Sequence, residues 1–231
     1  MFDSLFRAVE RSRKRFVVYS DVETDLEERF AAYNVDVEHR SLPPGGPDPF
    51  LVVEASGEFA GAISLDSLST LLEPPILHPD DDSGVSEGYR VLFETFDNTL
   101  FTSMDRGQLL AVSRELEDRA YRAGTGTLRA SFQRLSAFEP QVETYRRLGR
   151  ETELDIHLYG ADDWDPPALP GVTYHIDDGD LEHYWAVTFV EGSEDGRFGA
   201  LLARQKGDRY DGFWTDDDEM TREIDATLER R

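Results

Sequence analysis

The chain has 231 residues, and its 24 Lys and Arg against 48 Asp and Glu give a formal charge of −24 at pH 7. This acid excess argues against nucleic-acid partners, whose binding proteins neutralise phosphates with clustered cations, and against anionic membrane surfaces. The absence of cysteine excludes disulfide bonds, thiolate nucleophiles and Cys-ligated metals. The 39% hydrophobic and 11% aromatic content is too high for a disordered acidic chain, so a folded core is predicted.

The basic residues are almost all arginine. Lys14 and Lys206 are the only lysines, which leaves 24 − 2 = 22 Arg. Depletion of Lys, with acidic residues spread along the whole chain, favours a halophilic protein whose self-repulsion is screened by high salt. The alternative is an acidic interaction protein. No apolar run approaches the ~20 residues of a membrane helix, and the N-terminus is unlike a signal peptide, so we expect a cytoplasmic protein without a membrane partner.

Hydrophobic periodicity in the first third predicts alternating helices and strands. The expected helices cover 3–14, 24–33 and a short segment that starts near 64–66 and ends before 74. The expected strands are 16–19, 35–37, 50–54 and 59–65, with a Pro- and Gly-rich loop at 41–49. The acidic segment 76–88 predicts a connector between an N-terminal part, 1–75, and a second part of the same domain, 89–231.

The second part predicts longer helices followed by clustered strands. Helices are expected at 87–96, 106–123, 139–150 and 217–228, and strands at 127–135, 154–159, 172–176, 184–190 and 200–205. Gly124 and Gly126 should end the helix 106–123. The fold class that fits this order is α/β or α+β, with a mixed or antiparallel sheet covered by helices in a single compact domain.

The sequence contains no nucleophile elbow, phosphate loop or other catalytic motif, so it does not predict an enzyme, and neither a metal nor another cofactor is expected. One minor alternative is open. Alternation places Asp155, His157 and Tyr159 on one face of the strand 154–159, and His175 on the polar side of the strand 172–176. If these strands are neighbours, two imidazoles and a carboxylate could form a metal or acid/base site.

The helix 106–123 carries the clearest candidate for a binding edge. At 100° per residue, Arg114, Glu117 and Tyr121 lie together beside its apolar stripe. Arg114 and Glu117 have the i, i+3 spacing of a surface ion pair. The alternative is a polar edge at a pocket mouth, where Arg114 engages an anionic or planar ligand and Glu117 holds it in place.

Residues 92–136, LFETFDNTLFTSMDRGQLLAVSRELEDRAYRAGTGTLRASFQRLS, resemble the central signature of the DICT family of sensory domains. The C-terminal segment 209–231, RYDGFWTDDDEMTREIDATLERR, is similar to the closing pattern of the same family, and RFVVYSDVETDLEERFAAYNVDVEHRSLP fits its opening strand, helix and strand. The resemblance implies a non-catalytic sensory or signal-input domain, without catalytic residues that can be carried over.

A sensory domain without a cyclase, kinase or helix-turn-helix motif must signal to a separate protein, such as a histidine kinase, a cyclase-type protein or a transcription regulator. We therefore expect an unidentified small-molecule ligand and a signalling partner in a two-component or transcriptional pathway. The alternative is a ligand-free adaptor that docks to such a partner. The candidate ligand-binding residues, which could also be ordinary core, are Phe96, Asn98, Phe101, Arg114, Glu117, Tyr121, Phe132 and Trp214.

Overall fold

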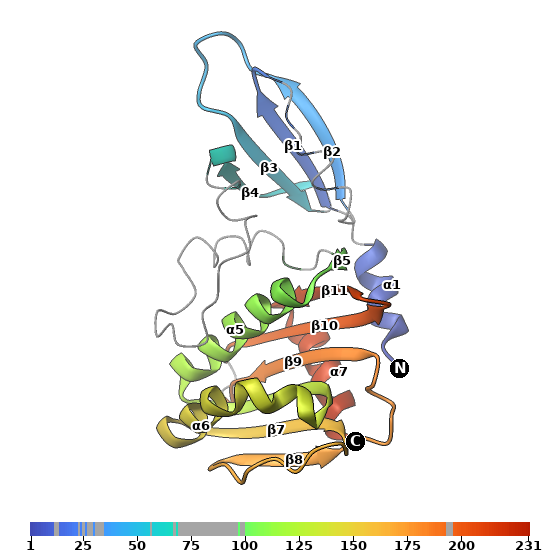
Figure 1. Cartoon of the computed structure of the whole chain (residues 1–231). Coiled ribbons are helices and arrows are strands. Elements are labelled where there is room, and N and C mark those ends of the chain that lie inside the picture. Colours follow the sequence, from blue (N-terminus) through green and yellow to red (C-terminus); the bar gives the residue numbers. More distant parts are fainter. Residues whose placement is uncertain are drawn as a thin grey trace.

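The computed structural model describes residues 1–11, 14–22, 24, 26, 30, 35–55, 57–66, 68, 97, 100–192 and 196–231. In this part the chain forms two mixed sheets and four α-helices, which confirms the predicted α+β class (Figure 1). No helix among these residues has both the length and the apolar character needed to cross a membrane. The predicted connector 76–88 and the predicted helix 87–96 lie outside the described residues.

The smaller sheet has four strands in the order β2-β1-β3-β4. The strands are β1 (Lys14–Ser20), β2 (Val35–Ser41), β3 (Phe50–Ala55) and β4 (Glu58–Ser64). β1 runs parallel to β2 and antiparallel to β3. Apolar side chains such as Phe16 and Leu51 are fully buried beneath it, and Phe16 packs edge-on against Phe30 at 5.0 Å between ring centroids. β1 and β3 follow the predicted runs closely because β-branched and aromatic residues make up half or more of each.

The larger sheet has seven strands in the order β5-β11-β10-β9-β6-β7-β8. Its strands are β5 (Phe101–Met104), β6 (Thr125–Arg134), β7 (Glu153–Ala161), β8 (Val172–Ile176), β9 (Tyr184–Val190), β10 (Phe198–Lys206) and β11 (Arg209–Thr215). β6, β7 and β8 are parallel neighbours, whereas the pairs from β5 to β6 are antiparallel. The strands therefore divide the sheet into a parallel and an antiparallel half.

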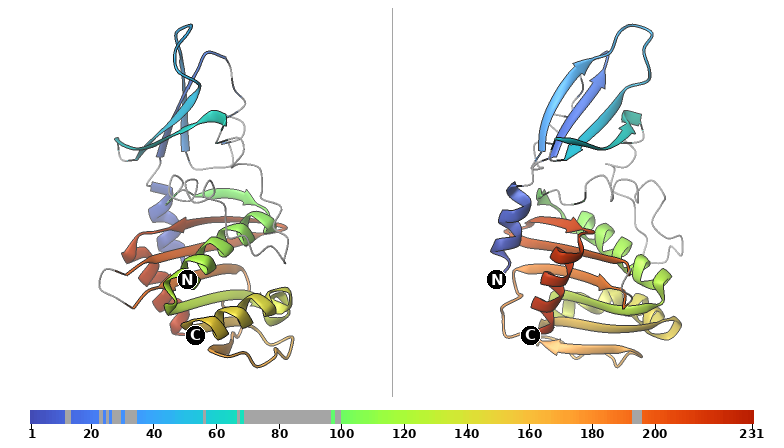
Figure 2. Two further views of the ribbon diagram at one scale, coloured as in Figure 1. Left: turned by 90° about the vertical axis from the view of Figure 1, so that its left-hand side faces the viewer. Right: turned by 180° about the vertical axis from the view of Figure 1, so that it is seen from behind.

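Helices cover both faces of the larger sheet (Figures 1 and 2). One face carries α5 (Arg106–Ala123), a 3₁₀ helix η1 (Leu135–Gln141) and α6 (Val142–Glu151). The opposite face carries α1 (Asp3–Arg11) and α7 (Asp218–Glu229). Alternate strand residues enter two apolar layers, so that Leu201 packs beneath α5 while Leu202 packs beneath α1 and α7.

The ends of α5 are well defined, and they agree with the predicted helix 106–123. Asp105 accepts a hydrogen bond from the backbone of Gln108 at 2.9 Å, while the Gln108 side chain accepts one from the Asp105 backbone at 2.9 Å. This reciprocal capping box satisfies two backbone donors at the start of the helix. Gly124 ends the helix in the left-handed region, with φ 71°, and its N–H bonds to the carbonyl of Ala120.

Other boundaries differ from the prediction. The predicted helix 139–150 is a 3₁₀ turn that contains Pro140, followed by α6, which starts only at Val142. Gly126 does not end a helix but lies in β6. The strands β5 and β11 were not predicted, because β11 contains Arg209, Asp211 and Gly212 and lacks clean alternation. The predicted helix 24–33 falls mainly outside the described residues.

Gly149 tests the packing of α6 against the loop before β8. A Cβ added at Gly149 would lie 1.8 Å from the carbonyl oxygen of Pro170. We expect Gly149→Ala to lower the free energy of unfolding by about 1 to 3 kcal/mol or more, although alanine is the better helix former. Gly61→Ala in β4, whose added Cβ has nothing within 4 Å, is the matched control. Urea unfolding of both variants measures the difference, and equal stability would contradict the close approach.

Candidate functional site

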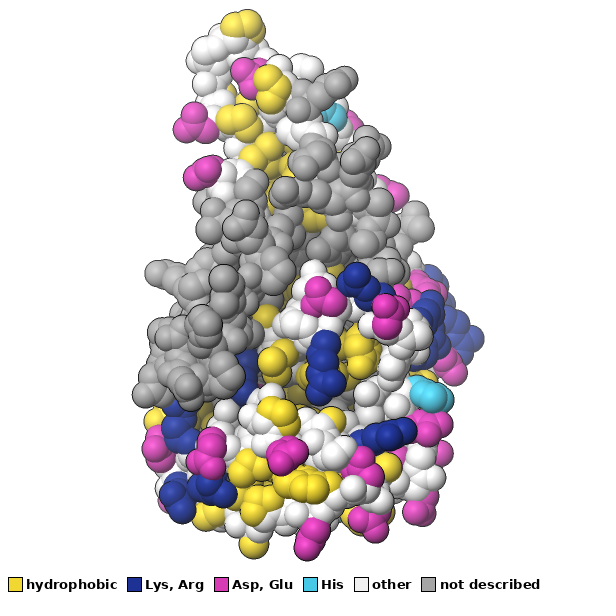
Figure 3. Space-filling model, in the orientation of Figure 1, with side chains coloured by type: hydrophobic (Ala, Val, Ile, Leu, Met, Phe, Trp, Pro, Cys, Tyr) yellow, Lys and Arg dark blue, Asp and Glu magenta, His cyan; other side chains and the backbone are white. Residues whose placement is uncertain are grey.

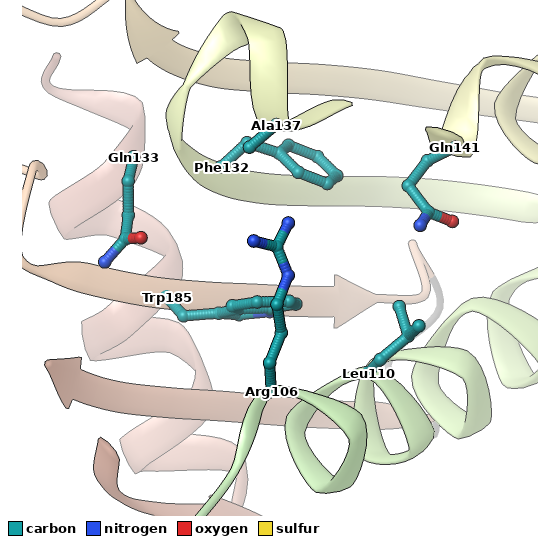
Figure 4. A pocket seen from close by; sticks show the side chains of 7 residues that line it. All are labelled: Arg106, Leu110, Phe132, Gln133, Ala137, Gln141 and Trp185. Carbon is teal, nitrogen blue, oxygen red and sulfur yellow. The ribbon is translucent and has the colours of Figure 1, made fainter. Parts of the chain in front are cut away.

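A pocket lies between α5 and the segment that joins β6 to α6 (Figure 4). The hollow between atoms, counted together with the open solvent at its mouth, measures about 400 Å³, and only a small part of this space is enclosed. We call it the α5 pocket and define it by its seven lining residues: Arg106, Leu110, Phe132, Gln133, Ala137, Gln141 and Trp185. These residues come from α5, β6, η1 and β9, so the pocket exists only once the sheet and its covering helices have assembled.

Arg106 provides the charge of the α5 pocket. Its guanidinium carbon lies 5.8 Å from the ring centre of Trp185, which is within the range of a cation–π contact. No carboxylate among the described residues forms an ion pair with Arg106, despite the acid excess of the chain. The indole beneath is fixed, because Trp185 Nε1 donates to Ser113 Oγ at 3.0 Å, and Ser113 in turn donates to the carbonyl of Leu109. Arg106 is therefore a cation on a rigid aromatic base.

Gln133 enters the pocket through a distortion of β6. The β6–β7 register shifts between Ser131 and Arg134, and Gln133 has a positive φ of 60°, which is unusual for a residue other than glycine. Such irregularities redirect side chains and are common at binding sites. The Gln133 side chain donates to Gln205 Oε1 at 3.1 Å, and Gln205 donates to the carbonyl of Gly207 at 2.8 Å. This chain of bonds leaves the Gln133 carbonyl oxygen facing Arg106 (Figure 4).

Gln141 connects the pocket to a buried ionic network. Its side-chain oxygen accepts a hydrogen bond from Arg114, which also pairs with Glu117 at 2.5 Å. The second oxygen of Glu117 accepts from the hydroxyl of Tyr145 at 2.8 Å. Burial alone would lower the pKa of Arg114, but the Glu117 carboxylate outweighs burial and raises that pKa above its ordinary value. Because Arg114 holds the oxygen of Gln141, the amide nitrogen faces the pocket (Figure 4).

Of the eight residues predicted for ligand binding, Phe132 lines the α5 pocket. Arg114 and Glu117 lie directly behind it, where they form the predicted i, i+3 pair in a buried setting. Phe101 and Trp214 stack on each other at 4.2 Å in the core, and neither lines the pocket. Tyr121 is 37% exposed and donates to Glu151 at 2.8 Å. Phe96 and Asn98 lie outside the described residues.

Sequence reasoning missed six of the lining residues. Arg106 and Leu110 precede Arg114 at intervals of four, so the helical spacing that singled out Arg114 could have identified them. Gln133, Ala137 and Gln141 left no signal, because their position depends on the distortion of β6 and on the 3₁₀ turn that follows. The sequence predicted that Trp185 lies on a strand. The face of the sheet that it occupies and the helix that it contacts depend on the order of the strands, which the sequence did not reveal.

The polar cluster predicted on β7 and β8 forms on the opposite face of the sheet. The strands are parallel neighbours, His157 Nδ1 lies 2.9 Å from His175 Nε2, and His157 Nε2 lies 3.0 Å from Asp155 Oδ2. Tyr159 stacks on His175 at 4.6 Å. The meeting of the two imidazoles and the carboxylate is thus confirmed. No three His, Asp or Glu side chains in the described part of the chain are arranged to hold a metal.

Tyr145 tests the buried network. Burial and the Glu117 carboxylate raise the pKa of Tyr145 well above its ordinary value. We expect Tyr145→Phe to cost about 1 to 3 kcal/mol of unfolding free energy, because one oxygen of Glu117 loses its donor in the interior. Tyr121→Phe, which removes an exposed bond to a carboxylate, should change stability by less than about 0.5 kcal/mol. Denaturant unfolding at neutral pH compares them, and equal effects would contradict the network.

The imidazole pair predicts a pH dependence of stability. Burial, His157 and Arg129 lower the pKa of His175 from 6.5, and the smaller opposing effect of Asp155 does not reverse this. The folded state therefore binds this proton less readily than the unfolded state, and stability that is present above pH 6.5 is lost as the pH falls through the folded pKa. His175→Gln should flatten this part of the profile, whereas His183→Gln, at a side chain 69% exposed, should not. Urea unfolding across pH 5 to 8 measures both, and unchanged slopes would contradict the assignment.

No curated protein matches the sequence. A crystal structure of polyphosphate kinase from Porphyromonas gingivalis is similar at 12% identity and a TM-score of 0.37, over 99% of this chain and 48% of that one. The chain thus spans about half the length of that enzyme, and so low a TM-score assigns neither fold nor function. Residues 91–204, which contain α5 and the whole α5 pocket, match the DICT family, described as a sensory domain in diguanylate cyclases and two-component systems, and the match indicates a signal-input role.

Proposed function

We propose that this protein is a non-catalytic signal-input protein that binds a small molecule in the α5 pocket and passes the signal to a separate partner. The observation that carries the proposal is Arg106, which lies over Trp185 and pairs with no carboxylate among the described residues, in a pocket that lies entirely within the sensory-domain match. The match also covers the resemblance at residues 92–136. The resemblances of the N-terminal segment and of 209–231 lie outside it and remain predictions.

The pocket walls are preorganised, as a selective small-molecule site requires. Trp185 is held by Ser113, Gln141 is held by Arg114, and the ring of Phe132 packs edge-on against Phe138 at 5.2 Å. A ligand therefore meets side chains that are already fixed by other parts of the fold. Little ordering is needed on binding, which favours affinity from a small contact area.

Helix α5 links the pocket to other elements and is the element through which we expect the signal to pass. Arg106 and Leu110 contribute to the pocket at one end. Further along, Arg119 pairs with Glu115 at 3.0 Å and with Asp216 at 2.6 Å, between β11 and α7. A ligand that prefers one placement of α5 would shift this contact as well, since a ligand can favour only the state that it binds more tightly. The partner would read the altered surface.

The partner is a protein of a two-component or transcriptional pathway, and the setting is a halophilic cytoplasm. The choice of pathway rests on the family description. The halophilic setting rests on the low Lys content and the charge of −24. Neither membrane nor nucleic acid is a direct partner in this proposal. A ligand-free adaptor is the competing function, and the following experiment separates the two.

The test compares wild type with Arg106→Gln after incubation with a metabolite extract at molar salt. Retained small molecules are released by denaturation and identified by mass spectrometry. Because a charge-assisted hydrogen bond contributes about 1.5 to 3 kcal/mol, Arg106→Gln should weaken retention about 10- to 100-fold. Arg150→Gln, at an exposed arginine near the far end of α6, is the matched control and should retain the ligand.

The result that overturns the proposal is the absence of any metabolite whose retention depends on Arg106. Capture of a signalling partner by the same ligand-free protein would then favour the adaptor. A retained metabolite of any chemical class supports the proposal, provided that Arg150→Gln keeps it and Arg106→Gln loses it.

A further inference from the structure

We propose that the α5 pocket selects a small aromatic monocarboxylate, with a preference for one that carries a hydroxyl on its ring. This inference rests on the proposed function, because it names the ligand class of the same site. It follows from three properties of the described lining residues: one uncompensated positive charge, hydrogen-bond groups with defined directions, and aromatic side chains that face a space for one ring.

The charge of the site favours a monoanion. Of the two arginines at the pocket, Arg114 is neutralised by Glu117 at 2.5 Å, whereas Arg106 pairs with no described carboxylate. Within the part of the chain that the structure describes, one positive charge therefore remains at the pocket, and a ligand with one negative charge balances it. A dianion such as a phosphate monoester would retain an unbalanced charge in a chain of −24, and acidic side chains are scattered over this face of the molecule (Figure 3).

The donors favour a carboxylate. The planar guanidinium of Arg106 matches the two oxygens of a carboxylate in a bidentate pair. The amide nitrogen of Gln141 faces Arg106 across the pocket, because its oxygen is occupied by Arg114 (Figure 4). Arg106 and Gln141 thus offer donors to one anionic group. A neutral amide would place its own NH₂ against these donors and would lose a hydrogen bond.

The apolar walls favour an aromatic ring. Phe132 and Trp185 come from β6 and β9, and Leu110 closes the side near Gln141 (Figure 4). Phe132 is fixed by Phe138 and by Tyr145, whose ring centroid lies 6.0 Å away. The pocket is small and opens to solvent at its mouth, so its walls can contact a ligand of at most one ring. Offset or edge-on packing against the two fixed rings stabilises such a ligand beyond its burial.

Gln133 accounts for the preference for a hydroxyl. Gln205 is oriented by its bond to the carbonyl of Gly207, and it accepts the amide N–H of Gln133. The Gln133 oxygen is therefore the atom turned toward the pocket, and it accepts but cannot donate. A ring hydroxyl can donate a hydrogen bond to this oxygen, whereas an unsubstituted ring offers no donor, so that only water can bond to it.

The experiment measures binding of benzoate, the three monohydroxybenzoates, phenyl phosphate, benzamide and benzylamine to the full chain at molar salt. Ligand-observed NMR gives the affinity, and fluorescence of wild type and Trp185→Phe assigns the response to Trp185. We expect benzoate to bind, one hydroxybenzoate to bind several-fold more tightly, and the amide and the amine to show no binding. Phenyl phosphate should bind more weakly than benzoate.

Variants locate the interactions. Arg106→Gln should weaken benzoate binding at least tenfold, and Arg150→Gln should leave it unchanged. Gln133→Asn, which tolerates the left-handed backbone, should remove the advantage of the hydroxyl, so that the ratio of hydroxybenzoate affinity to benzoate affinity falls toward one. Circular dichroism of each variant establishes that it is folded. A hydroxyl advantage that survives in Gln133→Asn would overturn the assignment of this group.

Several results contradict the inference. Binding of benzamide or phenyl phosphate as tight as that of benzoate would overturn the charge argument, and equal benzoate binding to Arg106→Gln would place the ligand elsewhere. Absence of benzoate-class binding would overturn the ligand class. The proposed function fails separately, because an extract metabolite of another class that depends on Arg106 would support the input site while it contradicts the carboxylate.

Discussion

The face of the larger sheet that carries α5, η1 and α6 depends on the contacts of one buried carboxylate, that of Glu117. A charge removed from water is costly unless it is paired and hydrogen-bonded, and Glu117 has both kinds of partner, in Arg114 of its own helix and Tyr145 of α6. Arg114 also bonds to Gln141, so one carboxylate joins α5, the 3₁₀ turn and α6. The lining of the α5 pocket is positioned by this network, although Glu117 itself is not among the lining residues.

Much of the fold could be predicted because local signals and burial agree. The runs that became β1, β3 and β9 are rich in β-branched and aromatic residues, and the capping of α5 by Asp105 and Gly124 matches its apolar periodicity. β11 was missed because it is buried along most of its length although it contains Asp211 and Gly212, so its sequence does not alternate as a half-buried strand does. The order of the strands could not be read from any single segment.

The site was predicted only in part, and the reason is physical. Arg114 and Glu117 could be grouped from helical spacing, which is a property of one element. Their burial and the contact with Gln141 depend on α6 and on the 3₁₀ turn before it, so no periodicity in α5 reveals them. The aromatic residues Phe101 and Trp214 look alike in sequence as core or as pocket, and their stacking places them in the core. The imidazole pair was easier to predict from the sequence, because it required only that two strands with alternating polar residues be neighbours.

The construction of the pocket wall has a consequence for how this protein could diversify. Phe132, Gln133, Ala137 and Gln141 all lie in one segment of ten residues, between the distortion of β6 and the start of α6. Substitutions there change the shape and polarity of the wall while the strand pairs of the sheet and the capped helix α5 stay as they are. Selectivity for a new ligand can therefore evolve through substitutions in this one short segment, as it does in proteins whose binding loops are held by a rigid scaffold.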